Sequence, residues 1–368
     1  MQRYFFSFKK KTTFKKIGHN IANNFFTVIE QFFNWYHQEG RSLPWREQPE
    51  PYPVFLSEVI LQQTRVEQGL AYFHRFMDTF PTVQDLANAS EEEVLKLWQG
   101  LGYYSRARNL HKAAKHLMEI HQGIFPSNFN ELIKIPGVGP YTARAILAFA
   151  FSKPEVAADG NIWRVTSRFF GLNNEFPTKK SMELTQELWK VWVVQQPSVF
   201  NNAMMDLGSG ICTPKQPKCE QCPLQSQCFS FPSGAWVNLP FKEKKTKVKP
   251  LTLVYLISKS DGKVLMKKRA ENTIWANMYD FPEMIFPSHW NSEMDILEEI
   301  SKNSRVSTVH SIAKQSFHLL SHRKIQPFFC FVDFVPILQL EREEKWIPLE
   351  QIHELPVPKI IESLIATF

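Results

Sequence analysis

Long hydrophobic runs are missing from this sequence, although 43% of its 368 residues are apolar and 14% are aromatic. No stretch approaches the roughly 20 uninterrupted apolar residues that a membrane-spanning helix requires. A secretory signal is missing as well, because the apolar run at residues 4–8 is short and is followed by three lysines. We therefore expect neither a membrane protein nor a secreted protein, and the apolar and aromatic content excludes a mostly disordered chain.

An excess of basic residues is also missing from the body of the chain, in spite of the net charge of +7. Residues 1–29 hold six Lys or Arg and no acidic residue, residues 30–232 hold 19 basic and 20 acidic residues, and residues 233–368 hold 18 and 16. We expect residues 1–20 to form a basic extension, with an organellar transit peptide as the alternative. Nearly balanced charge elsewhere excludes DNA binding through a uniformly basic surface, so any contact with DNA must use local geometry, backbone amides and a few placed cations.

Cysteine is scarce, with five residues in the chain, yet Cys212, Cys219, Cys222 and Cys228 fall within seventeen residues. Thiolates bind soft metals, and a pair two residues apart can direct both sulfurs toward one centre. Two disulfides would need an oxidising compartment, so the spacing favours a metal site. Zinc and an iron–sulfur cluster both use four cysteines and remain open at this point. The fifth, Cys330, lies in an apolar run and is expected to be an ordinary buried thiol.

The pattern of apolar residues changes near residue 230. Before it they recur at helical spacing, which predicts an all-helical half. After it, residues 242–250 form a charged segment that is typical of a linker. Residues 251–257, 263–267 and 327–335 are rich in β-branched and aromatic residues, and Asp261-Gly262 is a hairpin signal between the first two. The second domain is therefore predicted to be α+β.

Residues 131–150 predict two helices joined by a tight glycine turn. Prolines at both sides of the turn end one helix and begin the next, and the glycines allow backbone amides to be exposed. Amides at the start of a helix bind phosphate, which gives sequence-independent contact with a nucleic-acid backbone. The alternative is a plain connecting turn, but the full Pro-Gly-Val-Gly-Pro frame favours DNA binding. The candidate contacts are Gly137, Val138 and Gly139.

Two carboxylates have unusual surroundings. Glu58 precedes Val59, Ile60 and Leu61, so it either faces solvent or has a raised pKa that lets it carry a proton at neutral pH. Asp159 follows small apolar residues and precedes a predicted helix, where a simple N-cap would also explain it.

Together these features resemble the helix-hairpin-helix DNA glycosylases, and within them the adenine DNA glycosylases of the MutY type, from about residue 25 to residue 368. The resemblance is carried by segments 56–64, 100–108, 135–142 and 159–161 and by the cysteine loop. It implies a multidomain fold, in which an all-α glycosylase domain with an iron–sulfur loop precedes an α+β Nudix-like domain. It also implies a [4Fe-4S] cluster on the four cysteines, which decides the metal. The expected segments are an extension over 1–20, a glycosylase domain over 21–232 with its hairpin at 131–150 and its loop at 212–228, a linker over 233–249 and a lesion-recognition domain over 250–368.

The resemblance also assigns roles to single residues. It implies that Glu58 is the general acid that protonates the flipped adenine, and that Asp159 stays ionised beside the sugar, where it stabilises or transiently bonds the oxocarbenium-like centre. Tyr141 and Asn161 match positions that assist there. The residues that match the adenine pocket or the opened duplex are Trp45, Arg46, Gln63, Leu101 and Tyr103.

The C-terminal domain departs from the family in one motif. The Phe-Ser-His loop that contacts 8-oxoguanine corresponds to Leu320, Ser321 and His322, and leucine cannot stack as phenylalanine does. Lesion discrimination is then weaker, or Phe317 assists it.

A second departure from the family is Asn202, in the helical half, where relatives carry a longer Gln or Glu. The acidic box that gathers magnesium in Nudix hydrolases is absent, which indicates a binding module.

The alternative family is the endonuclease III type, which shares the fold and the cluster but attacks oxidised pyrimidines through a lysine Schiff base. That lysine corresponds to Tyr141, so the covalent route has no amine here. The resemblance therefore implies a monofunctional glycosylase that removes adenine opposite 8-oxoguanine or guanine in double-stranded DNA. It further implies a monomer in the cytoplasm, associated with the nucleoid in a bacterium, with a sliding clamp as a candidate partner.

Overall fold

The structure is a computed structural model that describes residues 19–240, 248–286, 288, 292–320, 322–335, 340–341 and 343–368, with the backbone alone over 19–26. Residues 1–18 of the predicted extension, residues 241–247 of the predicted linker and Ser321 lie outside the described residues. The chain forms two compact units, Met1–Glu58 with Phe125–Glu243, and Val59–Ile124 with Lys244–Phe368. No helix in the described part of the chain is long and apolar enough to cross a membrane.

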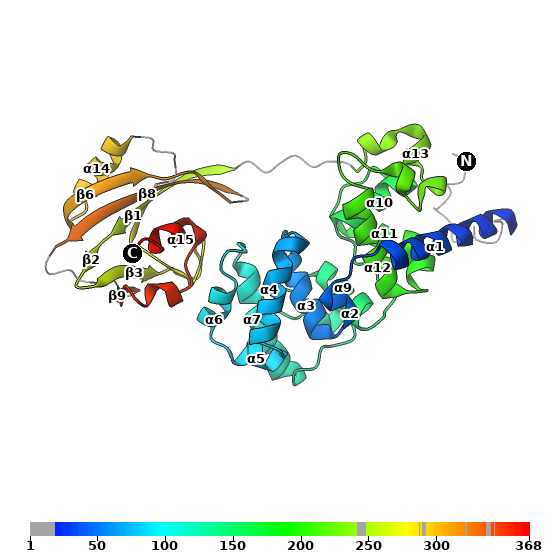
Figure 1. Cartoon of the computed structure of the whole chain (residues 1–368), viewed down its shortest axis with the longest axis horizontal. Coiled ribbons are helices and arrows are strands. Elements are labelled where there is room, and N and C mark those ends of the chain that lie inside the picture. The colour runs from blue at the N-terminus through cyan, green and yellow to red at the C-terminus, as the bar shows by residue number, and fades with distance from the viewer. Residues whose placement is uncertain are drawn as a thin grey trace. The chain divides into compact units, whose positions relative to one another are not determined.

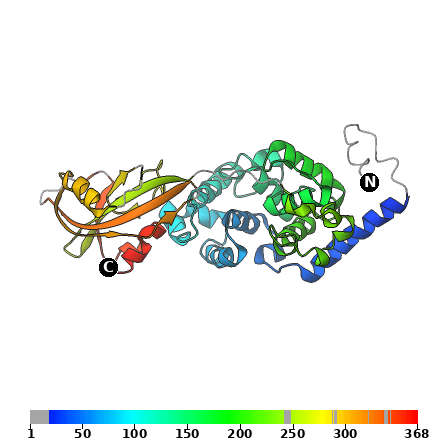
Figure 2. The ribbon, with the colours of Figure 1, turned by 90° about the horizontal axis from the view of Figure 1, so that it is seen from above.

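Helices form every regular element of the described residues before Lys249 (Figures 1 and 2), as the apolar periodicity predicts. The helices that lie wholly or mainly in the first unit are α1 (His19–Glu39), α2 (Pro44–Glu47), α3 (Pro51–Leu61), α8 (Phe129–Leu132), α9 (Pro140–Ala150), α10 (Gly160–Phe170), α11 (Lys179–Val193), α12 (Pro197–Asp206) and α13 (Ser230–Ser233). The second unit contributes α4 (Val66–Thr79), α5 (Val83–Asn88), α6 (Glu91–Leu97), α7 (Ser105–His121), α14 (Glu293–Ser301) and α15 (Lys359–Ile365). Shorter helical turns are the π-helix η3 (Leu207–Ile211) and the 3-10 helices η4 (Cys219–Gln221), η5 (Gln225–Gln227), η6 (Ala235–Val237) and η7 (Ile352–Glu354).

Large aromatic side chains hold the first unit together. Phe32 of α1 packs against Trp192 of α11 and Phe200 of α12, with ring centroids 5.6 and 6.2 Å apart, and all three are buried. Trp189 adds a hydrogen bond from its indole nitrogen to the Thr166 hydroxyl of α10, at 2.8 Å. Burying rings of this size supplies much of the hydrophobic stabilisation, and the hydrogen bond satisfies the one polar atom of the Trp189 side chain. This core fixes α10 and α12, whose ends carry the polar residues described below.

Two helices flank the predicted glycine turn of residues 131–150, but the first is short and ends four residues before Pro136. Helix α8 ends at Leu132, Gly137 takes a left-handed φ of 76°, and α9 begins at Pro140 with Gly139 as its N-cap residue. Only glycine adopts such a φ at little cost, and proline suits the first helical position because its missing N–H has no intrahelical partner there. The turn places Tyr141 in the first turn of α9.

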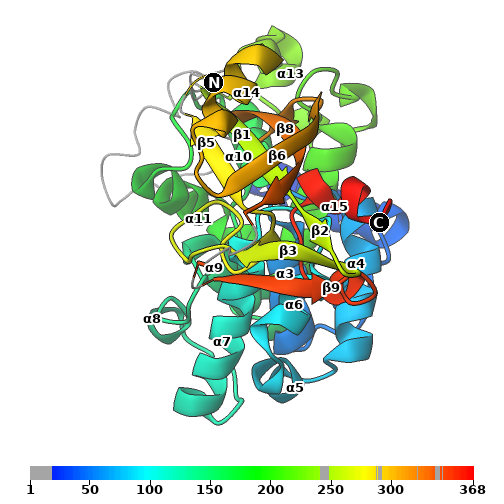
Figure 3. The same cartoon turned by 90° about the vertical axis from the view of Figure 1, so that its left-hand side faces the viewer.

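The C-terminal residues form two sheets, as predicted for an α+β domain (Figure 3). One sheet has the order β5-β1-β8-β6 with β7 paired to β8, and the other has the order β2-β3-β4 with β9 paired to β3. The strands are β1 (Lys249–Ile257), β2 (Lys259–Ser260), β3 (Lys263–Lys268), β4 (Tyr279–Asp280), β5 (Glu283–Phe286), β6 (Val306–Lys314), β7 (His318–Leu319), β8 (Arg323–Phe334) and β9 (Glu344–Pro348). Asp261 and Gly262, both with positive φ, form a two-residue turn as predicted, but it joins β2 to β3. Residues 251–257, which were predicted to pair with 263–267, belong to β1 in the other sheet.

The first sheet is mixed, because β1 and β8 run parallel while its other pairs are antiparallel. Helix α14 covers one face, where Ile296 and Ile300 join Val254 and Phe328 in a buried cluster. Cys330 lies in the same cluster with no exposed surface, which confirms the prediction of a buried thiol.

Candidate active site

Glu58 is buried inside the first unit, with 8% of its surface exposed. It lies in α3, whose sequence is apolar around its whole circumference, so the carboxyl group is removed from water with the helix. Burial and the nearby Asp159 raise the pKa of Glu58 to about 7, against the opposing effects of a hydrogen bond with Tyr141 and the charge of Arg46. Of the two alternatives that the sequence left open, the structure selects the raised pKa. Such a carboxyl group holds a proton that it can donate near neutral pH.

Tyr141 projects from the first turn of α9 toward this carboxyl group and forms a hydrogen bond with it. Burial, together with the charges of Glu58 and Asp159, raises the pKa of Tyr141 well above its usual value. The hydroxyl therefore stays protonated and donates its hydrogen to Glu58.

Asp159 is the N-cap of α10, and it is also part of this site. One carboxylate oxygen accepts a hydrogen bond of 2.7 Å from the amide of Ile162, and the other accepts one of 2.7 Å from the Asn161 side chain. Burial raises the pKa of Asp159, while these hydrogen bonds and Arg164 oppose the shift. Asp159 can therefore cap the helix and also take part in chemistry. The start of the helix stabilises a negative charge, and a carboxylate is what a cationic centre would need.

Arg164, to which the sequence assigned no role, connects this carboxylate cluster to the cysteine loop. Its guanidinium donates to the Asn161 side chain at 2.8 Å, to the Gly208 carbonyl at 2.6 Å and to the Cys212 carbonyl at 2.8 Å. The signal in the sequence is that Arg164 follows Asn161 by three residues, which places both on one side of a helix.

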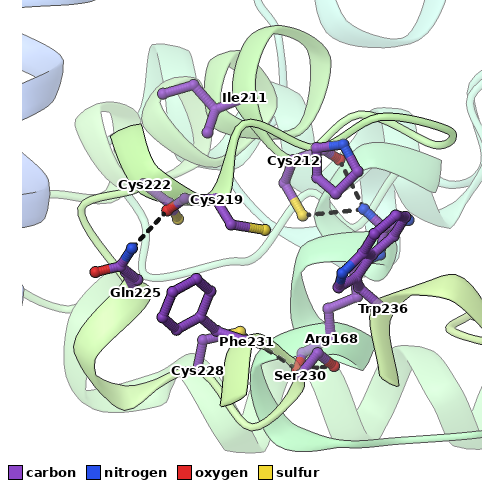
Figure 4. Close-up of a pocket in the computed structure, with 11 residues that line it drawn as sticks. Arg168, Ile211, Cys212, Cys219, Cys222, Gln225, Cys228, Ser230, Phe231 and Trp236 are labelled. Atoms are coloured by element: carbon purple, nitrogen blue, oxygen red, sulfur yellow. Dashed lines mark hydrogen bonds between the residues drawn. The ribbon is translucent and has the colours of Figure 1, made fainter. Parts of the chain in front are cut away.

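The four cysteines surround one pocket of the first unit (Figure 4). All four are free thiols, so the disulfide alternative does not hold. Arg168 lines the pocket and donates to the Cys212 sulfur at 3.4 Å and to the Thr213 carbonyl at 2.7 Å. Within the described residues no group of three or more candidate ligands could hold a single metal ion. Zinc would need its sulfurs at about 2.3 Å from one centre. A cluster instead binds each thiolate to a separate iron atom, which suits sulfurs that line a wider pocket.

Arg46 lies in the short helix α2 beside the buried Trp45. Its positive charge acts on Glu58, so the structure brings this sequence-predicted residue together with the carboxylates. Asn202, the shorter substitute for Gln or Glu, is buried in α12 and donates to the Ser198 hydroxyl at 3.4 Å.

The turn residues of the hairpin differ in exposure. Gly137 is exposed, whereas Val138 is buried and its amide donates to the Ile135 carbonyl at 3.0 Å. Gly139 is half-buried, and a Cβ added there would meet no atom within 4 Å.

Gln63, Leu101 and Tyr103 belong to the second unit. Gln63 and Tyr103 are exposed and have left-handed φ values of 59° and 48°, while Leu101 is buried. Arg106 holds the turn that contains Gln63, because its guanidinium donates to the carbonyls of Ile60 and Gln62. The sequence did not reveal this support for the turn.

In the C-terminal sheet the residues around the predicted recognition loop alternate in exposure. Phe317 is 44% exposed and Leu319 is 70% exposed, whereas Leu320 is half-buried and His322 is exposed. The apolar side chains that reach the surface here are therefore the neighbours of Leu320.

Three family models match the chain. Residues 56–192 match the HhH-GPD superfamily of base excision DNA repair proteins, residues 212–228 match the iron–sulfur binding domain of endonuclease III, and residues 253–367 match a NUDIX domain. An adenine DNA glycosylase from Buchnera aphidicola subsp. Schizaphis graminum is 32% identical over 352 residues, which cover 93% of this chain and 99% of that protein. The adenine DNA glycosylase of Schizosaccharomyces pombe is 32% identical over 80% of this chain and 78% of its own length. The human adenine DNA glycosylase is 29% identical over 91% of this chain and 72% of its own length.

Solved structures resemble the helical part. A thermostable thymine-DNA glycosylase superposes with a TM-score of 0.52 at 27% identity, over 58% of this chain and 98% of that one. A non-covalent endonuclease III–DNA complex superposes with a TM-score of 0.50 at 23% identity, over 58% of this chain and 97% of that one. This similarity supports the fold alone.

Proposed function

The chain belongs to the adenine DNA glycosylases, enzymes of base excision repair that hydrolyse N-glycosyl bonds, and on that basis we propose that it removes adenine paired with 8-oxoguanine or guanine. It binds duplex DNA and carries a [4Fe-4S] cluster in the loop that contains the four cysteines. The observation that supports the proposal best is the buried Glu58, whose pKa of about 7 is set by burial with Asp159, Tyr141 and Arg46 around it.

Glu58 is the proton donor in this proposal. Adenine leaves poorly as an anion, so a proton on the base lowers the barrier to breaking the N-glycosyl bond. A carboxyl group with a pKa near 7 is still partly protonated at neutral pH, and its conjugate base is strong enough to take a proton back from water. The Tyr141 hydroxyl donates to Glu58 and keeps the carboxyl group oriented.

Asp159 must be ionised, whereas Glu58 must carry a proton, because positive charge develops on the sugar as the bond breaks. The hydrogen bonds from Ile162 and Asn161 favour its carboxylate form and fix both oxygens. A preorganised carboxylate at this place stabilises the cationic centre without reorganising during the reaction.

The enzyme is proposed to be monofunctional, since Tyr141 supplies no amine for a Schiff base with the sugar. Cys212, Cys219, Cys222 and Cys228 hold the cluster, which supplies a covalent cross-link of the loop through its iron–sulfur bonds. The C-terminal domain, with His322 and the exposed Phe317 and Leu319, is proposed to recognise the base opposite adenine.

Three DNA duplexes test this function. They contain adenine opposite 8-oxoguanine, adenine opposite guanine, or thymine glycol. We expect base loss at adenine alone, with strand cutting only after alkali. Cutting at thymine glycol without alkali would support the endonuclease III type instead. If no duplex reacts although iron is present, the chain only binds DNA.

Gly208 provides a first test of the supporting structure, because a Cβ there would lie 2.7 Å from the Asn161 Cβ and 3.1 Å from the Asn161 carbonyl oxygen. The Gly208→Ala variant is expected to displace Asn161 and with it Asp159, which lowers the excision rate about tenfold and the free energy of unfolding by about 1–3 kcal/mol. Single-turnover excision and thermal unfolding measure both. Gly210→Ala in the same π-helix is the matched control, since its Cβ would meet no atom within 4 Å. Equal behaviour of the two variants would contradict the expected displacement.

A further inference from the structure

Arg46 cannot be held in place by its own helix. Helix α2 has four residues, and a single turn does not persist without tertiary contacts. Yet the Arg46 side chain is only 9% exposed, so contacts with the protein and not water determine where its guanidinium lies. Any role of Arg46 beside Glu58 therefore depends on a residue elsewhere in the first unit.

Asp206 is that residue. It ends α12, 160 positions after Arg46, and its carboxylate receives the guanidinium through two hydrogen bonds, from Nη1 to Oδ2 at 2.8 Å and from Nη2 to Oδ1 at 2.9 Å. A two-point contact between a fork of N–H groups and a carboxylate restricts rotation as well as distance. The Asp206 side chain is itself only 5% exposed.

Arg41 completes the arrangement from the other side of the carboxylate. Its backbone amide donates to Oδ2 at 3.0 Å and its Nε to Oδ1 at 2.8 Å, while its carbonyl accepts a hydrogen bond of 3.1 Å from Arg46. Burial by itself would raise the pKa of Asp206, but the hydrogen bonds and charge of Arg46 and the hydrogen bonds from Arg41 hold it below its usual value. Asp206 is therefore a permanent anion between two cations.

The contacts leave one donor of Arg46 uncommitted. Its Nε is buried and has no hydrogen-bond partner among the described residues, whereas Nη1 and Nη2 are bound to Asp206. A buried donor without a partner is costly and is suited to a ligand that brings an acceptor. The groups that face the guanidinium are Asp206, the hydroxyl of Tyr36, the carbonyl of Arg41 and, through its charge, Glu58.

We propose that Asp206 is a positioning residue of the adenine pocket, which fixes the guanidinium of Arg46 so that Nε is directed to the flipped base and the positive charge acts on Glu58. The inference depends on the proposed roles of Arg46 and Glu58. It assigns to the end of α12 a function in base recognition, in addition to its place next to the π-helix that leads into the cysteine loop.

The Asp206→Asn variant tests the proposal, because it keeps the size of the side chain and removes the charge and one acceptor. Losing a charged two-point contact lets Arg46 rotate away, and we expect KM for the adenine duplex to rise roughly 10–100-fold. Besides burial, the groups that set the pKa of Glu58 are Tyr141, Asp159 and Arg46, and Asp206 is not among them. If Arg46 leaves, a cation that lowers this pKa is lost, and the decline of kcat with rising pH moves to higher pH. A role of Asp206 in stability alone would leave that profile unchanged.

Controls separate the outcomes. Asp78→Asn is the matched control, because it removes a carboxylate from an exposed aspartate of α4, and it should change neither KM nor the pH profile. In an Arg46→Gln background, Asp206→Asn should add less than a twofold effect, because both changes remove the same contact. Asp206→Glu keeps the charge and should recover most of the affinity, which provides a test if Asp206→Asn folds poorly. Additive effects in the double variant, or an unchanged KM in Asp206→Asn, would overturn the proposal. If Glu58→Gln loses activity while Asp206→Asn has an unchanged KM and pH profile, this inference is refuted and the proposed function stands.

Discussion

The Glu58→Gln variant is expected to excise adenine about 10²–10⁴-fold more slowly than the unchanged protein, the range that general acid catalysis contributes. Glutamine occupies nearly the same volume and can still accept a hydrogen bond from Tyr141, but it has no proton to give to the base. Single-turnover rates with an adenine:8-oxoguanine duplex measure the effect. Glu67→Gln is the control, because Glu67 is exposed on α4. A rate within threefold of the unchanged protein would remove Glu58 from the mechanism.

The same residue predicts how activity depends on pH. Burial is the main cause that raises the pKa of Glu58 to about 7, so the carboxyl group loses its proton as the pH rises through that value. Excision should therefore decline above pH 7 in the unchanged protein. A rate that increases steadily to pH 9 would contradict a protonated Glu58.

The stability of the unchanged protein should fall as the pH rises, whereas the Glu58→Gln variant should lack this dependence. Because the folded protein binds the Glu58 proton more tightly than the unfolded chain does, stability from this group is complete below about pH 4.5 and is lost as the pH rises through 7. Glu58→Gln has no charge to bury, so above pH 7 it should be more stable than the unchanged protein by roughly 3 kcal/mol. At pH 4 the two should unfold alike. Denaturant unfolding at both pH values measures the difference, and equal stability at pH 8 would show that Glu58 is not buried as described.

The Cys212→Ser variant is expected to lose the cluster, to unfold several kcal/mol more easily and to lose measurable excision. A metal centre bound only by the folded state contributes its binding energy to folding. Cys212 has a further importance, because its carbonyl accepts hydrogen bonds from Arg164 and Arg168. When the loop detaches, Arg164 loses the support from which it contacts Asn161.

Iron content, thermal unfolding and excision measure the three effects. Cys330→Ala is the matched control, because this cysteine lies in β8 and far along the chain from the loop; it should keep the iron. A Cys212→Ser protein that retains full iron and activity would show that the cluster does not depend on this thiolate.

The apolar periodicity and the turn residues were sufficient to predict much of the fold. Helices before residue 230, strands after it, the Asp261-Gly262 hairpin and the glycine turn before Pro140 follow from local preferences, which short segments express without help from the rest of the chain. The parallel pairing of β1 with β8 did not follow, because more than 60 residues separate these strands and no local signal states which strands become neighbours.

The candidate site likewise combines features that the sequence predicts with features that only the tertiary structure shows. The sequence by itself determined the residue types: an acid in an apolar helix, an N-cap aspartate, a tyrosine where a lysine would form a Schiff base, and four clustered cysteines. Only the tertiary structure decided that Glu58 is buried with Tyr141, that Arg164 joins Asn161 to the cysteine loop, and that Asp206 holds Arg46. The physical reason is that a pKa and a hydrogen bond depend on what surrounds a group in space, and those neighbours come from helices that are distant in the chain.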